Sequence, residues 1–458
     1  MNACSPCQLA PSTIGTYLYK RGFHKKYGKI FKERLGPVTN LSISDPALVE
    51  EILRTEGKYP FRPPYQSWVL YNELYNRKGG TMTADGEHWK KCRSVMNPKF
   101  LRPKAVGEFV EGINGVVASF VDRLRLLKDA TGDGEPIPHL PNELSKFTME
   151  ALGWVLLDKR LGCLEEHVEE KVQNFISSIA TMFLTGHQLM IFANVHQKLN
   201  TKPWRNHVRS WNTIYEIAQD YIDERMKDVA ERLSGDIKEG ERVDFLTYLV
   251  GSGKLSREEI YVNITEVLLG GVDTAANSFS FLLYSLAKHT ESQDILLEEV
   301  DRVLGGKVCS YEDLQRMPYL KAVVKETLRL YPPIPINARV MQEDTVIDNT
   351  LIPKGTIVLL NKYTMARDEK IFTNPDKFIP ERWLRAEAKD WHPFSSIPFG
   401  YGARSCVGRR IAETEIYLAT VGICQKFRMS VSDKFDIKPS VRTQLTPGPE
   451  LPILFTER

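Results

Sequence analysis

Residues 399–408 have the sequence FGYGARSCVG, and this stretch decides how the rest of the chain is interpreted. Three glycines lie around a single cysteine, Cys406, and a helix is expected to begin directly after them. Glycine permits turns with positive φ and a close approach of the backbone to other groups. Backbone amides and the helix N-terminus can therefore face the sulfur and favour the thiolate, the form of cysteine that binds a metal. The stretch predicts a metal site with Cys406 as a ligand.

The residues around Cys406 suit a haem iron better than zinc. Zinc takes three or four protein ligands, and neither the other cysteines nor the nine histidines recur at zinc-ligand spacing. Arg404, two residues before Cys406, is placed to meet an anionic group beside the metal. A single thiolate with a flanking arginine suits haem. A structural cysteine in a turn stays open as the alternative.

The whole chain has the composition of a globular protein. Of its 458 residues, 42% are hydrophobic and 26% are charged, unlike a disordered chain. No linker-like segment and no internal repeat divides it, so we expect one domain over residues 1–458, with residues 1–16 disordered or trimmed. The 61 basic residues nearly balance the 58 acidic ones, which argues against a nucleic-acid partner. No apolar run is long enough to predict a transmembrane helix.

Hydrophobic periodicity predicts a helix-rich chain with short strands. The longest predicted helix begins at Ser256, because Ser256 and Glu259 can form a capping box and apolar residues then continue to about Lys288. Thr290 is placed to cap the helix that follows. The predicted helices are 17–33, 46–55, 86–96, 103–128, 142–156, 201–233, 256–288, 290–304, 318–330 and 409–426. The predicted strands are 38–43, 345–352 and 356–360, followed by a strand-like tail.

A second motif, GGVDT at residues 270–274, lies in the middle of the longest predicted helix. Each glycine costs about 1 kcal/mol relative to alanine inside a helix, so a helix that only packs has little reason to hold two. We therefore expect a groove for a small ligand at this point. An acid beside an alcohol at such a groove can relay protons, which makes Asp273 and Thr274 candidate catalytic residues. The alternative is an ordinary core helix.

Three weaker patterns involve charged and aromatic side chains. Glu326 and Arg329 are three positions apart on a predicted helix and can pair. Trp89 and Arg93 are four positions apart and so share one helix face. Arg382 lies in an irregular segment further along the chain. Each pattern alone is also typical of surface ion pairs.

Taken together, these motifs resemble the cytochrome P-450 superfamily, and the resemblance extends from about Tyr17 to the end of the chain. It implies a mainly α fold with small β-sheets, in which a triangular prism of helices surrounds a buried haem. The implied cofactor is haem b (iron protoporphyrin IX), with the Cys406 thiolate as axial ligand. The haem-binding signature of the superfamily is FxxGxRxCxG, and every fixed position matches: Phe399, Gly402, Arg404, Cys406 and Gly408.

The resemblance also assigns functions to the other motifs. Asp273 and Thr274 would guide protons to bound dioxygen, although Ala275 stands where many relatives have a second hydroxyl residue. The residues implied to form a buried structural charge network are Glu326, Arg329 and Arg382. The residues implied to bind the cofactor are Trp89, Arg93, Arg339, Phe399, Arg404 and Cys406.

Three stretches narrow the resemblance within the superfamily. Residues 320–327 and 408–415 resemble its mitochondrial branch, and within it the chain resembles the vitamin D 24-hydroxylase and sterol 27-hydroxylase group, with residues 195–204 similar to the former especially. That branch takes electrons from a ferredoxin of the adrenodoxin type. Two lysines four positions apart place like charges on one helix face, which suits an acidic partner. We expect this partner to dock at Lys321, Lys325, Arg409 and Arg410, with a merely solvated basic face as the alternative.

The sequence thus predicts a haem-thiolate monooxygenase that uses O2 and ferredoxin electrons to hydroxylate a sterol, a secosteroid or a similar lipophile. We expect it in mitochondria, on the matrix side of the inner membrane, with peripheral membrane contact. Residues 182–193 are expected either at the membrane surface or in a buried helix. Leu269, Val272, Ile334 and Ile336 are candidate pocket residues. The alternatives are a microsomal-type monooxygenase served by a diflavin reductase, a haem-thiolate isomerase or peroxygenase that needs no donor, and a haem sensor.

Overall fold

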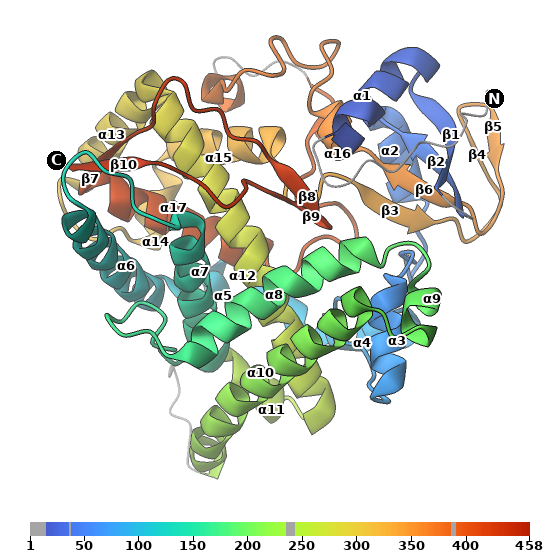
Figure 1. Ribbon diagram of the computed structural model, residues 1–458, viewed down its shortest axis with the longest axis horizontal. Helices are drawn as coiled ribbons and strands as arrows, with labels where there is room; N and C mark the ends of the chain where they lie inside the picture. The colour runs from blue at the N-terminus through green and yellow to red at the C-terminus, as the bar shows by residue number, and fades with distance from the viewer. Residues whose placement is uncertain (1–14, 36–37, 235–242, 386–390) are drawn as a thin grey trace.

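The computed structural model describes residues 15–35, 38–234, 243–385 and 391–458 of the chain. Helices account for most of these residues, and the strands are short, which confirms the predicted fold class (Figure 1). Residues 1–14, most of the segment expected to be disordered or trimmed, lie outside the described ranges. Gly15 and Thr16, at the end of that segment, already belong to a helix.

The elements keep the labels of Figure 1. Among the helices of the described ranges, none is both long enough and apolar enough to cross a lipid bilayer. The helices are α1 (Gly15–Tyr27), α2 (Pro46–Arg54), α3 (Gln66–Leu74), α4 (Gly86–Leu101), α5 (Pro103–Gly107), α6 (Val110–Thr131), α7 (Leu140–Leu157), α8 (Glu170–Gln188), α9 (Ala193–Lys198), α10 (Lys202–Ser234), α11 (Phe245–Gly251), α12 (Arg257–Lys288), α13 (Thr290–Leu304), α14 (Tyr311–Gln315), α15 (Pro318–Leu330), α16 (Lys362–Met365) and α17 (Arg409–Cys424), with short 3-10 helices η1 (Pro380–Trp383) and η2 (Pro393–Ser395).

The strands form small sheets. The largest sheet has the order β1-β2-β6-β3, in which β2 and β6 run parallel and the other neighbours run antiparallel. Ile43, Val358 and Leu360 of this sheet are fully buried in a core of their own, to which α2 contributes. The strands are β1 (Ile30–Leu35), β2 (Val38–Ile43), β3 (Asn337–Val340), β4 (Thr345–Ile347), β5 (Thr350–Ile352), β6 (Ile357–Leu360), β7 (Phe427–Ser430), β8 (Ser440–Arg442), β9 (Gln444–Thr446) and β10 (Leu454–Glu457).

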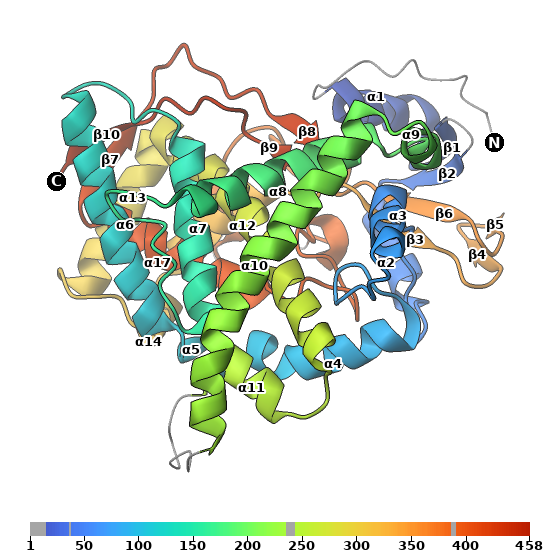
Figure 2. The same ribbon diagram turned by 60° about the horizontal axis from the view of Figure 1, so that its bottom comes forward.

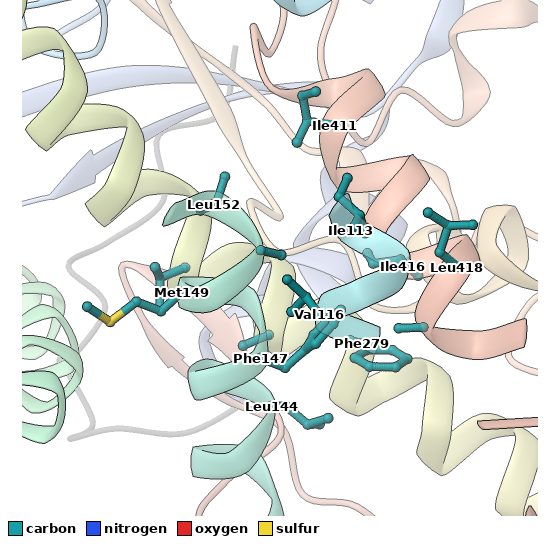
Figure 3. Close-up of a cluster of buried hydrophobic side chains, with 14 of the residues drawn as sticks. Ile113, Val116, Leu144, Phe147, Met149, Leu152, Phe279, Ile411, Ile416 and Leu418 are labelled. Atoms are coloured by element: carbon teal, nitrogen blue, oxygen red, sulfur yellow. The ribbon is translucent and has the colours of Figure 1, made fainter. Parts of the chain in front are cut away.

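The main core includes the space between α6, α7, α12 and α17 (Figure 3). Val116 of α6, Phe147 of α7 and Phe279 of α12 are fully buried, and Leu418 of α17 is nearly so. Burial of each such side chain contributes about 1.5–3 kcal/mol. This packing holds α12 in the middle of the molecule, where α8 and α10 cross it on one side (Figures 1 and 2).

The capping signals predicted for α12 and α13 have different outcomes. Ser256 and Glu259 form the predicted capping box, and α12 then continues to Lys288. At 1.5 Å per residue this helix is roughly 48 Å long. Thr290, however, is already the first residue of α13, and His289 occupies the N-cap position without a side-chain cap. The predicted cap at Thr290 is wrong because only one residue separates the two helices.

Residues 17–33 were predicted as one helix, but the helix ends at Tyr27. Gly28 follows with φ of +92°, a conformation that glycine adopts readily. Residues 30–35 then form β1, because pairing with β2 outweighs the helix propensity of the lysine and glutamate in this stretch.

Two other predicted elements are divided in the structure. The predicted strand 345–352 is a hairpin of β4 and β5, because Asp348 and Asn349 take φ values of +49° and +56° and make a two-residue turn. The predicted helix 103–128 consists of α5 and α6, with a break between residues 107 and 110.

Candidate functional site

The cysteine loop, residues 399–408, leads into α17. Gly400 and Gly402 have φ values of +72° and +75°, which explains why glycine stands at these positions. The amide of Cys406 donates to the carbonyl of Phe399 at 2.9 Å, so the loop closes on itself. The amide of Gly408 donates to the Cys406 sulfur. The loop therefore aims backbone donors at the thiol from the start of a helix.

The surroundings of Cys406 disfavour the thiolate form of its side chain when no metal ion is bound to it. Burial raises the pKa of the Cys406 thiol, and this effect outweighs the Gly408 amide and the nearby cations Arg93, Arg62 and Lys362. A thiolate at this position therefore needs a further positive charge next to the sulfur. A bound metal ion supplies that charge and deprotonates a coordinating thiol. The chemistry of this residue thus fits a thiolate–metal bond.

The interior of the protein is open beside Cys406 and beside the middle of α12. The Cys406 side chain has accessible surface, and it is also strongly desolvated by the protein around it. It therefore lies deep in the protein, next to open space. In the GGVDT motif, four of the five residues are partly accessible, whereas residues 275–280 are buried. Asp273 of this motif is strongly desolvated although it has accessible surface, so the accessible surface faces the interior of the protein. The structure thus has room inside it at both motifs.

Cationic side chains gather around the cysteine loop. Arg93 donates to the carbonyl of Ser405 at 2.6 Å, and Lys362 donates to the carbonyl of Pro398 at 3.0 Å. Burial and repulsion from neighbouring cations lower the pKa of Lys362 to about 7. The same causes lower the pKa of Arg62 to about 9. The cationic cluster, as we name it, consists of Arg62, Arg93, Arg339, Lys362 and Arg404.

Carboxylates neutralise this cluster only in part. Glu56 pairs with Arg339, and Asp85 pairs with Arg404. Oε1 of Glu56 accepts from Arg339, whereas Oε2 has no hydrogen-bond partner within the described ranges. Burying charge without a partner is costly, so an excess of buried cations favours binding of an anionic group. The two propionates of haem are such groups. The residues present therefore fit haem.

Trp89 adds an unused donor to the same place. Its side chain is fully buried, and its indole N–H has no hydrogen-bond partner among the residues that the structure describes. The guanidinium of Arg404 lies 3.9 Å from the centre of its ring. An unsatisfied buried donor costs about 1–3 kcal/mol, so a bound acceptor at this point would be favourable. The structure thus brings Trp89, Arg93, Arg404 and Cys406 together with Arg339, although Arg404 and Arg339 each also pair with a carboxylate of the chain.

Glu326 of α15 is the centre of a buried charge network. Arg329 donates to both oxygens of Glu326 at 2.8 Å, and Arg382 of η1 donates to Oε1 at 3.0 Å. The amide of Ile379 and the indole of Trp383 also donate to Glu326, each at 2.9 Å. Glu326 and Arg329 are at most 1% exposed. All the partners come from the chain itself, so the geometry indicates a structural network.

The four residues expected at a docking surface lie on two helices. Lys321 and Lys325 are one turn apart on α15, and Lys325 is exposed. Arg409 and Arg410 are exposed at the start of α17, where Arg409 pairs with Glu413 at 3.1 Å. Glu413 also acts electrostatically on Lys321, which shows that the two pairs are near each other.

The two glycines of α12 have different surroundings. A Cβ on Gly271 would lie 2.5 Å from the Leu152 side chain of α7, so this side chain would have to move to make room for it. A Cβ on Gly270 would meet only Met82, at an ordinary 3.5 Å. The expectation that both glycines open a groove is therefore wrong for Gly271, whose missing side chain makes room for α7. Thr274 lies one turn from Gly270 and donates to its carbonyl at 2.7 Å.

Three residues of the site were missed by sequence reasoning. Lys362 follows strand β6, and Gln444 lies in the C-terminal hairpin, where its amide donates to Asp273 of α12. Neither residue belongs to a local sequence motif. Strand pairing places Lys362 at the site, and the position of the β8–β9 hairpin places Gln444 there. Arg62 precedes Pro63 and Pro64, and the residue before a proline favours an extended backbone. A charged residue in such a segment was the only sequence signal for the place of Arg62 at the site.

Comparison with known proteins identifies the family of the chain. The model of the cytochrome P450 family matches residues 13–455. The chain is 38% identical to cytochrome P450 27C1 of Danio rerio, over 98% of this chain and 86% of that protein. It is 36% identical to the mitochondrial 1,25-dihydroxyvitamin D(3) 24-hydroxylase of Rattus norvegicus, over 95% of this chain and 83% of that protein. It is 34% identical to the mitochondrial sterol 26-hydroxylase of Homo sapiens, with the same two coverages.

The family match extends over nearly the whole chain and includes the cysteine loop, the GGVDT motif and the Glu326 network. With these features and a helical fold of the expected class, the chain belongs to the cytochrome P450 family and is a monooxygenase whose cofactor is haem bound through a cysteine thiolate.

Proposed function

We propose that this chain is a mitochondrial hydroxylase of a sterol, a secosteroid or a similar lipophile, and that it receives electrons from a ferredoxin. The observation that carries the proposal is the cysteine loop, with an open interior beside Cys406 and an excess of buried cations around it. Two of the relatives named above are, by their names, mitochondrial hydroxylases of 1,25-dihydroxyvitamin D(3) and of a sterol.

Different residues of the chain have different functions at the site. Haem, when bound, supplies oxygen activation for the insertion of one oxygen atom into a C–H bond. Cys406 holds the metal through its sulfur. Arg93 and Trp89, together with the rest of the cationic cluster, would hold the propionates and orient the cofactor, and Phe399 closes the loop through its carbonyl.

Asp273 and Thr274 handle protons in this proposal. Burial raises the pKa of the Asp273 carboxyl to about 6, so it can both give and accept a proton near neutral pH. The Thr274 hydroxyl donates to the Gly270 carbonyl, and its oxygen remains free to accept another hydrogen bond. Both side chains belong to the accessible part of α12.

The basic residues of α15 and α17 support an acidic electron donor. Lys321, Lys325, Arg409 and Arg410 present positive charge on neighbouring helices, and α17 begins directly after the cysteine loop. A ferredoxin that binds here would approach the cofactor from the side of its thiolate ligand. Rim charges of this kind mainly raise the association rate.

Residues around α9 support contact with a membrane. Met190, Phe192, Val195 and Leu199 are about half to 70% exposed, which is unusual for four apolar side chains within ten residues. Met182 and Phe183, by contrast, are buried in α8. The segment 182–193 is therefore part buried helix and part exposed turn. We infer that this turn rests on the matrix side of the inner membrane and that lipophilic substrate enters beside it.

The candidate pocket residues differ in accessibility. Leu269 and Val272 are buried in the main core, whereas Ile334 and Ile336 are partly exposed. We propose that Ile334 and Ile336, which follow α15, line the substrate space, because only these two have surface available to a ligand.

The experiment is reconstitution of the haem-loaded protein with two electron-transfer systems. One receives NADPH, ferredoxin reductase and ferredoxin, and the other receives NADPH and diflavin reductase, each with a panel of sterols and secosteroids. We expect hydroxylated product with the ferredoxin system alone. Product with diflavin reductase alone would refute the ferredoxin partner. Product with peroxide and neither system would favour a peroxygenase, and no turnover at all would favour a haem sensor.

A further inference from the structure

The hairpin of β8 and β9 is closed by a strained residue. Arg442 and Gln444 are opposite each other, so Thr443 alone makes the turn. Thr443 has φ of +68°, which is rare for a β-branched residue. Backbone strain of this kind persists only where the surroundings hold it, and it is concentrated at functional sites.

Two hydrogen bonds hold the tip of the hairpin in place. The Thr443 hydroxyl donates to the carbonyl of Phe183 in α8 at 2.9 Å. The amide of Leu445 donates to the carbonyl of Pro333, just after α15, at 2.8 Å. The position of the tip is thus fixed from two sides, and the fold determines what Gln444 can reach.

Gln444 reaches Asp273, the acid of the GGVDT motif. The Gln444 side chain is fully buried, and its Nε2 donates to Oδ2 of Asp273. Its Oε1 has no hydrogen-bond partner among the described residues. The other groups that act on the Asp273 carboxyl are Arg442, on the same hairpin, and Asn277, one turn along α12. The hairpin therefore supplies two of the three groups that act on this acid.

An amide suits an acid that must change its protonation state. Gln444 can donate to a charged Asp273 and, after rotation of the amide, accept from a protonated one. A lysine or arginine could only donate, and an apolar side chain could do neither. With a pKa of about 6, Asp273 has both forms within reach near neutral pH.

We propose that Gln444 is a positioning residue that holds the Asp273 carboxyl in one place in both of its protonation states. The hairpin, held at its tip from two sides, places the amide, and the amide fixes the acid. The proposal deepens the proposed function, on which it rests for the proton-handling duty of Asp273. The contact between Gln444 and Asp273 does not depend on that duty.

The test titrates Asp273 directly in the ferric, haem-loaded protein without an electron donor. The infrared carbonyl stretch of the protonated carboxyl is followed against pH and is identified by its loss in Asp273→Asn. The variants are Gln444→Met, which keeps the length but loses the amide, and Gln444→Glu, which keeps the shape. The matched control is Thr443→Val, which loses the bond to α8 and keeps the amide.

In Gln444→Met we expect the half-titration of Asp273 to move upward by about one pH unit, because the charged form loses its donor. In Gln444→Glu we expect a larger upward shift, because two carboxyls share one site. Thr443→Val keeps the bond from Leu445 to Pro333, which still holds the tip, so it should titrate like the wild type. An unshifted titration in both Gln444 variants, or an equal shift in Thr443→Val, would overturn the proposal.

A second readout separates this inference from the proposed function. Product formed per NADPH is measured against pH in the ferredoxin system. We expect its acid limb to move upward with the infrared titration in Gln444→Met. If the infrared titration shifts and the acid limb does not, the positioning stands and the proton-handling duty of Asp273 fails. If neither moves, the positioning itself fails.

Discussion

Two buried groups of charges in this protein have similar residues but differ in how completely they are paired. The two oxygens of Glu326 accept from Arg329, Arg382, Ile379 and Trp383, and every donor belongs to the chain. In the cationic cluster beside Cys406, by contrast, the chain supplies fewer carboxylates than cations.

The difference separates a structural network from a binding site. Glu326 has no unused oxygen, whereas the cationic cluster lies beside an indole N–H on Trp89 that has no partner within the described ranges. Burial, together with repulsion from neighbouring cations, lowers the pKa of Arg62 and Lys362, so keeping these side chains charged costs free energy. A folded chain retains such an arrangement where a bound anion offsets the cost.

Breaking the paired network should have the largest effect on stability. Glu326→Ala leaves Arg329 and Arg382 as unpaired buried cations, and we expect the free energy of unfolding to fall by about 3–5 kcal/mol. Urea unfolding of the haem-loaded protein measures this change. Glu298→Ala, exposed on α13, is the control and should stay within about 0.5 kcal/mol of the wild type. A loss below about 1 kcal/mol in Glu326→Ala would contradict the assignment.

The two glycines of α12 show a similar contrast, because the space beside one of them is filled and the space beside the other is open. Gly271→Ala forces a methyl group against Leu152, and we expect a loss of about 1–3 kcal/mol in the free energy of unfolding. Gly270→Ala meets no such contact and should be neutral or stabilising by up to about 1 kcal/mol. Thermal unfolding of the two variants side by side measures the difference. Equal effects would show that Gly271 is not a packing residue.

Removing one donor from the open site should weaken haem retention. Trp89→Phe loses the indole N–H, and a hydrogen bond to a charged group contributes about 1.5–3 kcal/mol. We expect haem transfer to an excess of apomyoglobin to accelerate roughly tenfold or more. Trp204→Phe, a buried tryptophan of α10 in a separate core, is the control. Equal transfer rates for Trp89→Phe and the wild type would mean that the indole has no cofactor contact.

The smallest effect concerns charges at the molecular surface. Lys321→Gln with Lys325→Gln should raise the KM for ferredoxin a few-fold at low salt, because exposed ion pairs contribute about 0.2–1 kcal/mol each. The difference should fade as salt is raised. Lys198→Gln with Lys202→Gln, exposed on α9 and α10, matches the charge change. A similar KM increase in that control pair would remove the case for a specific docking surface.

The sequence was informative wherever a short segment determines its own structure. The capping box at Ser256, the turn glycines at 400 and 402 and the extent of α12 all follow from local rules. Strand β1 did not, because pairing with β2, and not the helix propensity of Lys32 and Glu33, decides its conformation. The sequence prediction also missed the helix break before Val110 and the turn between β4 and β5.

The site was predictable where it contains motifs and unpredictable where the chain returns to it from a distance. Cys406, Trp89 and Arg93 belong to local patterns and lie together in the structure. Lys362 and Gln444 have no pattern of their own and reach the site through sheet pairing and hairpin placement. The packing of Gly271 depends on Leu152, which lies more than 100 residues earlier in the chain. No local sequence rule can predict this contact.

The most direct test of the central claim is the carbon monoxide spectrum of the haem-loaded protein reduced with dithionite. It is recorded for the wild-type chain and for Cys406→Ala. A thiolate opposite carbon monoxide shifts the main haem absorption band strongly to the red, because the sulfur pushes electron density onto the metal. We predict the shifted band in the wild type and its absence in Cys406→Ala. A wild-type protein without that band, or a variant that retains it, would contradict the account.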